Sequence, residues 1–468
     1  MTAVSINCMP IPSAELIRRF DVSGPFYTSY PTADRFVEAF SADQVAQVLG
    51  QRYNGPAAML LPFSLYVHIP FCESLCYYCA RNKIITRHHE ASQTYLRYLS
   101  RELDLYTAHL GTAQRLSQVH LGGGTPTFLN DDELSQLMGL LRRNFNFAPR
   151  GEYAIEVDPR TVDASRLATL AELGFNRLSF GIQSFDPSVQ KAVNRFQPAE
   201  QVFALMESAR SLSFESVNVN LIYGLPQQTP ESFERTLAQV CELRPDRIAL
   251  HGYEHLPSRF KPQRRIIVAE LPLAGARLLM LSSSLAAFQK AGYVAMGIDH
   301  FALPGDALAV AKRQGRLHRN FQGYSDQPDC DLISLGVSAT GKVGATYSQN
   351  AETLEAYYDC LDQGRLPVVR GLALSRDDLV RRSVIMALMC QGQLDFESID
   401  LSYLIDFKSY FAAELETLRG MQEQGMVEVN ESGIQVSDMG GFFVRGVAMV
   451  FDRYLQADRN RARFSRII

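Results

Sequence analysis

Three cysteines lie close together in the stretch HIPFCESLCYYCARNK, residues 68–83. Cys72, Cys76 and Cys79 have the spacing C-x3-C-x2-C, in a chain that contains 8 cysteines in all. Three thiols at this density are expected to bind a metal or do chemistry when the protein is kept reduced. The remaining cysteines are scattered singly and are predicted to be small buried apolar side chains: Cys8, Cys241, Cys330, Cys360 and Cys390.

Two kinds of metal centre could explain these three thiols: a structural zinc site and an iron–sulfur cluster. A structural zinc ion takes four ligands, usually from two C-x2-C pairs, and the chain has no second pair; His88 and His89 would have to complete the site. A [4Fe–4S] cubane has four irons, so three cysteines leave one iron open to a small molecule. The spacing favours the cubane, with zinc as the outside alternative.

Two further features belong to a ligand site. VHLGGGTPT, residues 119–127, follows a predicted strand, and its glycines would let the backbone approach a ligand closely. It matches neither the dinucleotide-binding nor the P-loop fingerprint. Glu156, in YAIEVDPR, is a carboxylate at a strand end that could bind an ammonium or ribose hydroxyls; a surface salt bridge is the alternative.

Strands and helices are predicted to alternate from about residue 60 to 345. The predicted strands are SLYVHIPF, QVHLGGG, YAIEVDP, RLSFGIQSF, SVNVNLIYGLP, RIALHGYEHLP and YVAMGIDHF. Amphipathic helical patterns with Ser, Thr or Asp caps lie between them. Because nearly every predicted strand ends in polar, reactive or glycine residues, the pattern favours an α/β fold with an incomplete (β/α) TIM-like barrel over a doubly wound sheet.

The chain is predicted to have three parts. Residues 1–55 form an N-terminal extension covering the barrel mouth, residues 56–365 form the barrel, and residues 366–468 form a small, mostly helical, winged-helix-like domain. SRDDLVRRSVIMALMC, at residues 375–390, begins with an S-x-x-D cap. These helices carry no run of Lys or Arg, so packing or covering the substrate is favoured over DNA binding.

Composition limits the classes of function. The chain has 468 residues, a formal net charge of -4 and 46% hydrophobic residues. Its mild acidity argues against a nucleic-acid partner. No apolar run approaches the ~20 residues of a membrane span, and no signal peptide is recognised. We therefore expect a cytoplasmic protein, and a monomer.

The cysteine motif, at the end of the first predicted strand and with aromatic residues between the cysteines, resembles that of the radical S-adenosylmethionine (SAM) superfamily. The resemblance implies a [4Fe–4S] cluster whose open iron chelates SAM, and an electron that splits SAM into methionine and a 5′-deoxyadenosyl radical. The GGGTPT stretch resembles the loop that holds the SAM amino group.

Other motifs resemble one family within it, the oxygen-independent coproporphyrinogen III oxidases (coproporphyrinogen dehydrogenases). They run in order along the whole chain: YTSYPTA, LYVHIPFC, HLGGGTPT, IEVDPR, GFNRLSFGIQSF, VNRFQ, NLIYGLPQQTPESF, DHFALP, LHRNFQGY and FSRII. The resemblance implies oxidative decarboxylation of two propionates of coproporphyrinogen III to vinyl groups, giving protoporphyrinogen IX for haem. A tetrapyrrole substrate, an electron donor and an electron acceptor are the implied partners.

The resemblance also implies a set of site residues. Cys72, Cys76 and Cys79 would ligate the cluster, and one SAM, or two if the family pattern holds, would be lined by these residues: Tyr66, Tyr78, Gly123, Gly124, Thr125, Glu156, Gln183, Arg195 and Asn220. Tyr66, Glu156 and Arg81 are the predicted catalytic residues. Arg18, Arg19 and Arg35, beside aromatic residues, are candidates for binding propionates.

Three positions depart from the family pattern. Arg81 replaces a cysteine that is not a cluster ligand, Asn220 replaces an aspartate, and Glu254 replaces a small residue. A guanidinium cannot stand in for a thiol in proton or hydrogen transfer, but it could pair with a carboxylate. Two alternatives therefore stay open: a radical SAM paralogue acting on haem or another tetrapyrrole, and a non-catalytic haem-binding or haem-delivery protein.

Overall fold

The computed structural model describes residues 13, 15–17, 22–54, 62–110, 114–297 and 299–457. Contacts between residues divide the chain into two compact units. One comprises residues 34–273 and 327–374, and the other comprises residues 1–33, 274–326 and 375–468, each in its described part. The predicted boundaries after residues 55 and 365 stay predictions. Cys8, Arg18, Arg19 and the closing FSRII lie outside the described residues.

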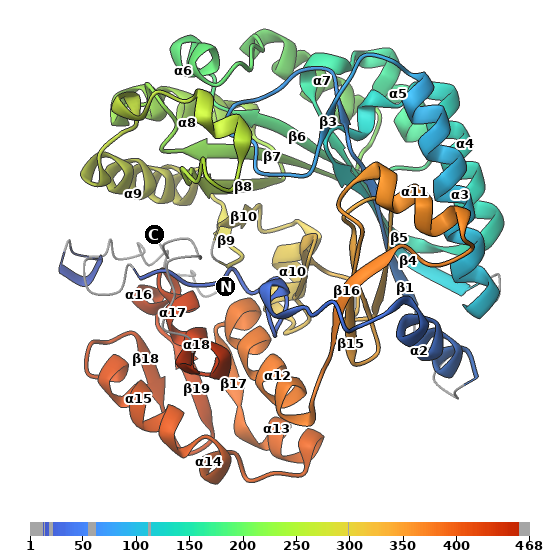
Figure 1. The fold of residues 1–468 in the computed structure, drawn as a ribbon. Helices are drawn as coiled ribbons and strands as arrows, with labels where there is room; N and C mark the ends of the chain where they lie inside the picture. The colour runs from blue at the N-terminus through green and yellow to red at the C-terminus, as the bar shows by residue number, and fades with distance from the viewer. Residues whose placement is uncertain are drawn as a thin grey trace. The chain divides into compact units, whose positions relative to one another are not determined.

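A large sheet forms the centre of the first unit (Figure 1). Its central strands are β1 (Phe63–Ile69), β4 (Gln114–Gly123), β5 (Phe145–Val157), β6 (Arg177–Gln183), β7 (Ser216–Tyr223) and β8 (Arg247–Gly252). They lie in the order β1-β4-β5-β6-β7-β8, and every neighbouring pair is parallel. The carboxyl ends of all six strands therefore lie at the same edge, as the sequence predicts.

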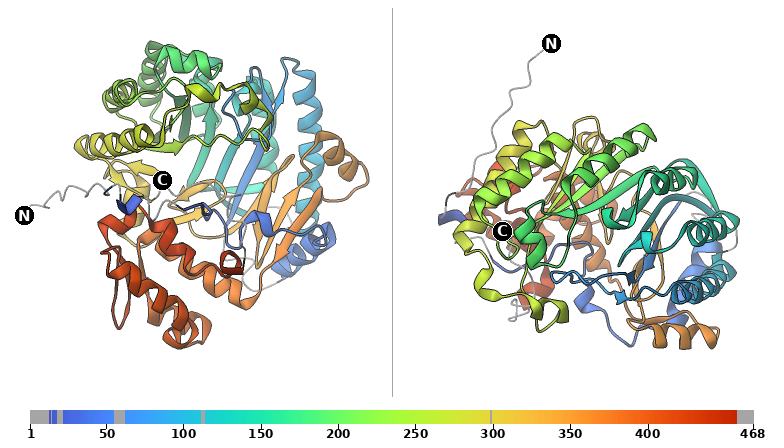
Figure 2. Two further views of the ribbon diagram at one scale, coloured as in Figure 1. Left: turned by 60° about the vertical axis from the view of Figure 1, so that its left-hand side comes forward. Right: turned by 90° about the horizontal axis from the view of Figure 1, so that it is seen from above.

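Helices connect these parallel strands, because a parallel neighbour can be reached only by a crossover. They are α3 (Glu90–Leu110), α4 (Asp131–Asn144), α5 (Ala164–Glu172), α6 (Pro187–Ala192), α7 (Ala199–Ser211) and α8 (Pro230–Leu243). The larger ones lie along the outer side of the curved sheet (Figure 2). This arrangement confirms the predicted α/β class with a (β/α) unit that does not close.

The predicted caps begin several of these helices. The Asp163 carboxylate accepts a hydrogen bond from the Arg166 backbone N–H at 2.8 Å at the start of α5. At α8, Thr229 accepts from the Ser232 N–H at 3.1 Å and the Ser232 hydroxyl accepts in return from the Thr229 N–H at 3.0 Å. Each such cap satisfies backbone donors that have no partner within the helix.

Antiparallel strands extend the sheet beyond β1, and the sequence did not indicate them. They are β13 (Asp331–Leu335), β14 (Thr340–Val343), β15 (Thr346–Asn350) and β16 (Val368–Ala373), with β13 parallel to β1 and the rest antiparallel. These strands have four to six residues; turns at Gly336 and Gly344 separate the first three, and α11 (Leu354–Asp362) lies between β15 and β16. Strands this short carry too few alternating positions to be recognised by periodicity.

A buried glutamate joins α3 to the turn after β13. Glu102 has no exposed surface, and its carboxylate accepts hydrogen bonds from the Gly336 N–H at 2.7 Å, the Asn350 side chain at 2.6 Å and the Tyr357 hydroxyl at 2.6 Å. Burial raises the pKa of Glu102 to about 7, although all three hydrogen bonds lower it. The neighbouring Tyr95 hydroxyl donates to the His68 carbonyl at 2.8 Å, so this corner is fixed to the end of β1.

The second unit contains the predicted C-terminal helical region. Its elements are α9 (Ala274–Lys290), α10 (Ala307–Arg313), α12 (Arg376–Gln391), α13 (Phe396–Tyr403), α14 (Phe407–Tyr410), α15 (Ala412–Gln422), α16 (Asp438–Gly441), α17 (Val444–Met449) and α18 (Arg453–Ala457), with a small sheet of β17 (Gln393–Asp395), β19 (Gly433–Val436) and β18 (Val427–Val429). The S-x-x-D cap is confirmed, because Ser375 and Asp378 form a reciprocal capping box. The described end of the chain is not one continuous helix, since α16, α17 and α18 are separate short helices.

One predicted strand of this unit is also wrong. YVAMGIDHF forms two short antiparallel strands, β9 (Val294–Ala295) and β10 (His300–Ala302), instead of one parallel strand. Gly297 lies between them, and a Cβ there would be 1.8 Å from the Tyr324 hydroxyl oxygen. This contact needs glycine, which interrupts the strand.

The N-terminal aromatic segment packs into the core of the same unit. Tyr27 and Tyr30 are 1% and 0% exposed, and the Tyr27 hydroxyl donates to the Asp452 carboxylate at 2.9 Å. The buried Arg445 guanidinium donates to the carbonyls of Gly24 and Pro25. These tyrosines therefore serve packing here. None of the described helices combines the length and the apolar character that crossing a lipid bilayer requires.

Candidate active site

The three cysteines of the motif lie near one another after the carboxyl end of β1. Cys72 ends β2 (Phe71–Cys72), and the Cys79 N–H donates to the Cys76 carbonyl at 3.2 Å, which folds the intervening residues into a turn. Burial raises the pKa of Cys72 to about 11; the Thr125 hydroxyl, which donates to its sulfur at 3.3 Å, lowers it, and the neighbouring thiolates of Cys79 and Cys76 raise it further. Thiolates gathered this closely are unfavourable unless a cation compensates their charge.

The glycine run places Thr125 beside Cys72. The Gly124 N–H donates to the Ile69 carbonyl at 2.8 Å, and a Cβ on Gly124 would lie 2.5 Å from the Pro70 carbonyl oxygen. Backbone cannot move aside as a side-chain end can, so this crossing of β4 over the cysteine loop requires glycine. Gly123 has φ +118, a conformation that also favours glycine.

Two arginines flank Cys76 and share one carboxylate. The Arg195 guanidinium lies 3.6 Å from the Cys76 sulfur and donates to both Asp158 oxygens at 3.2 Å. Arg160 lies 3.7 Å from the same sulfur and donates to Asp158 at 2.6 Å and 2.9 Å. Burial would raise the pKa of Asp158, but the two arginines hold it at about 2. Asp158 thus fixes two cations against the cysteine loop.

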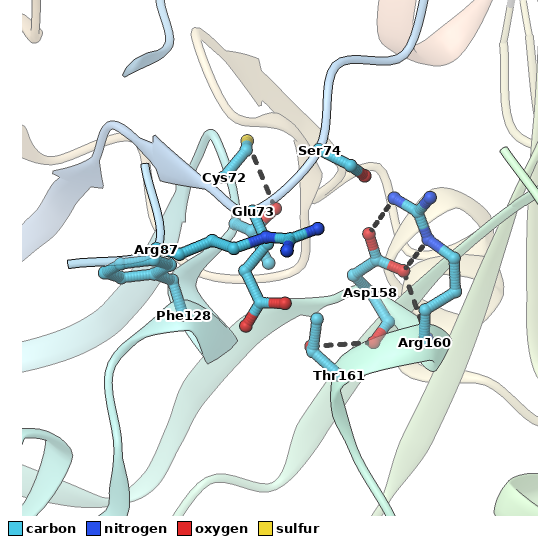
Figure 3. A pocket seen from close by; sticks show the side chains of 9 residues that line it. Cys72, Glu73, Ser74, Arg87, Phe128, Asp158, Arg160 and Thr161 are labelled. Carbon is cyan, nitrogen blue, oxygen red and sulfur yellow. Dashed lines mark hydrogen bonds and ion pairs between the residues drawn. The ribbon is translucent and has the colours of Figure 1, made fainter. Parts of the chain in front are cut away.

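A hollow of about 110 Å³ lies between these groups. Figure 3 shows the Asp158–Arg160 pair on one side of it and the Cys72 thiol on the other, and Thr161 bonded to the Asp158 carbonyl. Its lining combines a thiol, hydroxyls and charged groups, which suits a polar ligand.

Glu156, at the end of β5, is the centre of a second polar group. Its carboxylate lies 3.3 Å from the Arg81 guanidinium and 3.5 Å from His120 Nε2, and it accepts from the Gly123 N–H at 3.3 Å. Burial would raise the pKa of Glu156, but Arg81 and His120 lower it to about 2. Glu156 is therefore an anion at neutral pH, beside the glycine run.

Tyr66 joins this group through the sheet register. Tyr66 on β1 pairs with His120 on β4, and their rings stack with centroids 5.8 Å apart. The Tyr66 hydroxyl lies 3.0 Å from His68 Nδ1. Burial lowers the pKa of His68 to about 4, so this imidazole is neutral at neutral pH. The three predicted catalytic residues, Tyr66, Glu156 and Arg81, thus lie together.

Gln183 and Arg195 meet over Gly181 at the end of β6. A Cβ on Gly181 would be 3.0 Å from the Arg195 guanidinium and 3.2 Å from Gln183 Nε2. Gln183 has φ 68, and its buried Oε1, like Arg195 Nε, has no hydrogen-bond partner among the described residues. Buried polar atoms that lack partners favour a ligand that supplies them.

Asn220 lies in a separate polar group on β6 and β7. Its side-chain amide donates to the Ser179 hydroxyl at 3.0 Å, and the Asn218 amide donates to Asn220 Oδ1 at 3.2 Å. In register, Ser179 pairs with both Glu156 and Asn218, so a row of polar side chains crosses the sheet from β5 to β7. Glu254 follows β8 and is partly buried.

Sequence reasoning missed several members of the site. His68, His120, Arg160 and Asn218 each contact a predicted residue, and none of them was singled out. The period of two along β1, Tyr66 then His68, would have indicated the shared face for His68. Arg160 lies two residues after Asp158, where a 3-10 turn (Pro159–Thr161) brings it back, and no local pattern marks it. The proposed propionate ligand Arg35 pairs with Asp34 at 3.2 Å.

The cysteine loop fits an iron–sulfur cluster better than a single ion. Within the described part of the chain, no three Cys, His, Asp or Glu side chains are placed to hold one metal ion. A cubane takes its thiolates on separate irons, so its ligands need not meet at one point. The arginine and threonine donors on Cys76 and Cys72 are the hydrogen bonds to sulfur that stabilise such thiolates. His88 and His89, the zinc alternative, are not part of this group.

Two family models match the chain. The model described as Radical SAM superfamily matches residues 66–240, which span the strands from β1 to β7. The model described as HemN C-terminal domain matches residues 374–443, from α12 onward.

Curated relatives match almost the whole length. An oxygen-independent coproporphyrinogen III oxidase of Pseudomonas aeruginosa is 48% identical over 97% of this chain and 98% of its own length. A protein of the same name from Escherichia coli (strain K12) is 47% identical over the same shares. The solved structure of coproporphyrinogen III oxidase (HemN) from Escherichia coli, described as a radical SAM enzyme, has a TM-score of 0.87 and 46% identity, covering 92% of this chain and 97% of that one.

Proposed function

The chain belongs to the family of oxygen-independent coproporphyrinogen III oxidases, and on that premise we propose that it catalyses the oxidative decarboxylation of coproporphyrinogen III. Two propionates of coproporphyrinogen III become vinyl groups, giving protoporphyrinogen IX for haem biosynthesis. The observation that carries this proposal is identity of 48% over 97% of the chain, together with the grouped thiols of Cys72, Cys76 and Cys79.

We assign the three thiolates to a [4Fe–4S] cluster, and the groups around Glu156, Gln183 and Arg195 to SAM. When bound, the cluster and SAM would supply radical chemistry for removing a hydrogen atom from the substrate. The role of the protein is to bind the cluster and SAM next to each other. The Thr125 hydroxyl donates to the Cys72 sulfur, the Arg195 guanidinium donates to the Cys76 sulfur, and Gly124 allows the cysteine loop to lie close to the end of β4.

Glu156 is assigned to bind a hydroxyl or ammonium group of SAM. It is ionised at neutral pH, lies beside the Gly123 N–H and has a partly open carboxylate, 24% exposed. Charge-assisted hydrogen bonds to such a carboxylate are about twice as strong as neutral ones. Tyr66, which stacks on His120, is assigned to one wall of the same site.

Arg81 is assigned as the counter-ion of Glu156. It occupies the position where the family has a cysteine, and it keeps Glu156 ionised. Its guanidinium cannot donate a hydrogen atom or act as an acid at neutral pH. If the family cysteine takes part in hydrogen or proton transfer, this chain performs that step with another group or performs a different reaction.

That departure favours one second candidate. A radical SAM paralogue acting on haem or another tetrapyrrole would keep the cluster cysteines and differ from the family at other site positions, and Arg81, Asn220 and Glu254 are three such positions. The reduced thiols also suit the cytoplasm, where we place the reaction, and we propose that the working form is a monomer.

Product analysis tests the proposal. The anaerobically reconstituted protein is incubated with SAM, a reductant and coproporphyrinogen III, beside Arg81→Cys, and products are separated by chromatography. Vinyl product from the wild type supports the proposal. Deoxyadenosine without vinyl product supports the paralogue, as does vinyl product from Arg81→Cys alone. Neither product, with tight haem binding, points to a haem-binding protein.

A further inference from the structure

A basic loop follows β8 and carries charge that the site itself does not use. Residues 257–268, PSRFKPQRRIIV, contain four cations and no acidic residue. All four are exposed: Arg259, Lys261, Arg264 and Arg265. No ion pair with an acidic side chain joins any of them to the described part of the chain. Ile267 and Val268, at the end of the loop, are 59% and 64% exposed.

The basic loop contacts the cysteine loop directly. Gln263 is buried and donates from Nε2 to the Tyr78 carbonyl at 3.2 Å. The Arg265 guanidinium carbon lies 5.4 Å from the centre of the Tyr77 ring. Ile266 is buried in an apolar cluster against which Tyr77 and Tyr78 pack. Since these tyrosines lie between Cys76 and Cys79, the exposed cations sit on the outer side of the cluster ligands.

A segment with a further exposed apolar side chain, Phe196, contacts the cysteine loop. The Tyr77 N–H donates to the Val193 carbonyl at 3.0 Å, and the Asn194 amide donates to the Leu75 carbonyl at 2.9 Å. Val193 belongs to the same apolar cluster as Ile266. Phe196, two residues after Asn194, is 58% exposed. The cysteine loop is thus contacted by two segments that carry exposed apolar side chains, and one of these segments, the basic loop, also carries the four cations.

We propose that the basic loop is the docking surface for an acidic electron-donor protein that reduces the cluster. The inference rests on the proposed function, since it needs a cluster at Cys72, Cys76 and Cys79. The donor loses one electron and the cluster gains it, passing from the +2 to the +1 state; a flavin hydroquinone anion becomes the neutral semiquinone in the same step, and no proton moves.

Physical chemistry favours this occupant. Unpaired exposed cations attract an acidic partner and raise its association rate, an effect that weakens with salt. Exposed apolar side chains among the charges supply contact area without making the complex permanent, as transient redox encounters require. The propionates of the substrate are the alternative occupant, and the KM for coproporphyrinogen of the charge-reversal variant distinguishes the two.

Charge reversal tests the docking. Arg259→Glu with Lys261→Glu changes two exposed cations, neither of which donates a hydrogen bond to the cysteine loop. The matched control is Arg143→Glu with Arg150→Glu, two exposed cations near the amino end of β5. Each reconstituted protein is mixed anaerobically with reduced bacterial flavodoxin, an acidic flavoprotein, and separately with photoreduced 5-deazariboflavin, a small neutral reductant. Cluster reduction is followed by absorbance, and flavodoxin binding is measured by calorimetry without SAM or substrate.

We expect the Arg259/Lys261 variant to be reduced by flavodoxin at least tenfold more slowly, to bind it correspondingly more weakly, and to lose most of the salt dependence of the wild type. Deazariboflavin should reduce the wild type, the Arg259/Lys261 variant and the control at the same rate.

If flavodoxin reduced the wild type and the Arg259/Lys261 variant at equal rates, the docking surface would be overturned. Slower reduction of the variant by both reductants would also overturn it and would assign the loop to holding the cluster. A higher KM for coproporphyrinogen with unchanged flavodoxin rates would assign it to the substrate. A wild type that forms no cluster would overturn the proposed function as well. The milder Arg259→Gln/Lys261→Gln variant should show an intermediate loss of rate, which guards against misfolding.

Discussion

The Arg81 guanidinium lies 3.3 Å from the Glu156 carboxylate. This pair joins the residue that departs from the family pattern to the carboxylate assigned to SAM. Arg81 lowers the pKa of Glu156 and so favours its ionised form. The sequence comparison with the family pattern predicts a cysteine at position 81, and in this structure the arginine at that position is the counter-ion of Glu156.

The first prediction concerns this pair. Glu156→Gln should weaken SAM binding to the reconstituted protein at least tenfold, because it removes the charged acceptor. Arg81→Ala should change the SAM dissociation constant less than about fivefold, since its side chain is 59% exposed and exposed pairs contribute little. Equilibrium dialysis with labelled SAM measures both. A larger loss in Arg81→Ala than in Glu156→Gln would mean that Arg81 binds SAM itself.

The second prediction concerns the cluster ligands. Serine at Cys72, Cys76 or Cys79 should reduce the iron content of the reconstituted protein from about four per chain to near none. The controls Cys241→Ser and Cys360→Ser remove single, partly buried thiols elsewhere in the first unit and should keep their iron. Iron and sulfide analysis measures this. Full iron in any of the three ligand variants would contradict the assignment.

The third prediction concerns Gly124. Gly124→Ala should lower cluster occupancy and SAM binding together, because its Cβ would meet the Pro70 backbone at 2.5 Å and push the cysteine loop away from β4. Gly275→Ala, in α9, is the matched control, since its Cβ would have nothing within 4 Å. Absorbance of the reconstituted proteins measures occupancy. If both variants kept wild-type absorbance, the close crossing would not matter to the site.

The fourth prediction concerns the buried Glu102. Its folded pKa, about 7, lies above the ordinary value of 4.5, so the folded state favours the neutral acid. The contribution of Glu102 to stability is therefore greatest below pH 4.5 and is lost as the pH rises through about 7. At about 1.4 kcal/mol per pKa unit, the loss is on the order of 3 kcal/mol.

Glu102→Gln should remove this loss. Urea unfolding measures the free energy of unfolding of both proteins at pH 5 and pH 8. From pH 5 to pH 8, the stability of the variant relative to the wild type should increase. A constant difference would show that Glu102 titrates normally. Tyr357→Phe removes one hydrogen-bond donor to the Glu102 carboxylate, so this variant should lose more stability between pH 5 and pH 8 than the wild type does.

The sequence predicted the parallel sheet and the strand-end site because both follow from local pattern. Six of the seven predicted strands form, and Cys72, Glu156 and Gln183 lie at their carboxyl ends. The strands from β13 to β16 were missed because their pairing is decided by contacts distant in sequence, such as β13 with β1. Arg160 was missed for the same reason, since its role depends on Cys76, 84 residues earlier.

The resemblance to the family predicted which residues form the site, and the structure shows the hydrogen bonds and ion pairs among them. No sequence pattern relates Arg81 to Glu156, because one lies in an irregular loop and the other ends a strand. Likewise, nothing in the sequence relates Tyr27 to Asp452, 425 residues later, yet the two are joined by a hydrogen bond in the core of the second unit.

The central claim is that three thiolates hold a cubane with one iron left for SAM, and electron paramagnetic resonance of the dithionite-reduced protein tests it most directly. We predict a signal typical of a reduced [4Fe–4S] cluster whose g-values shift when SAM is added. A protein without that signal, or a signal that SAM leaves unchanged, would contradict the account.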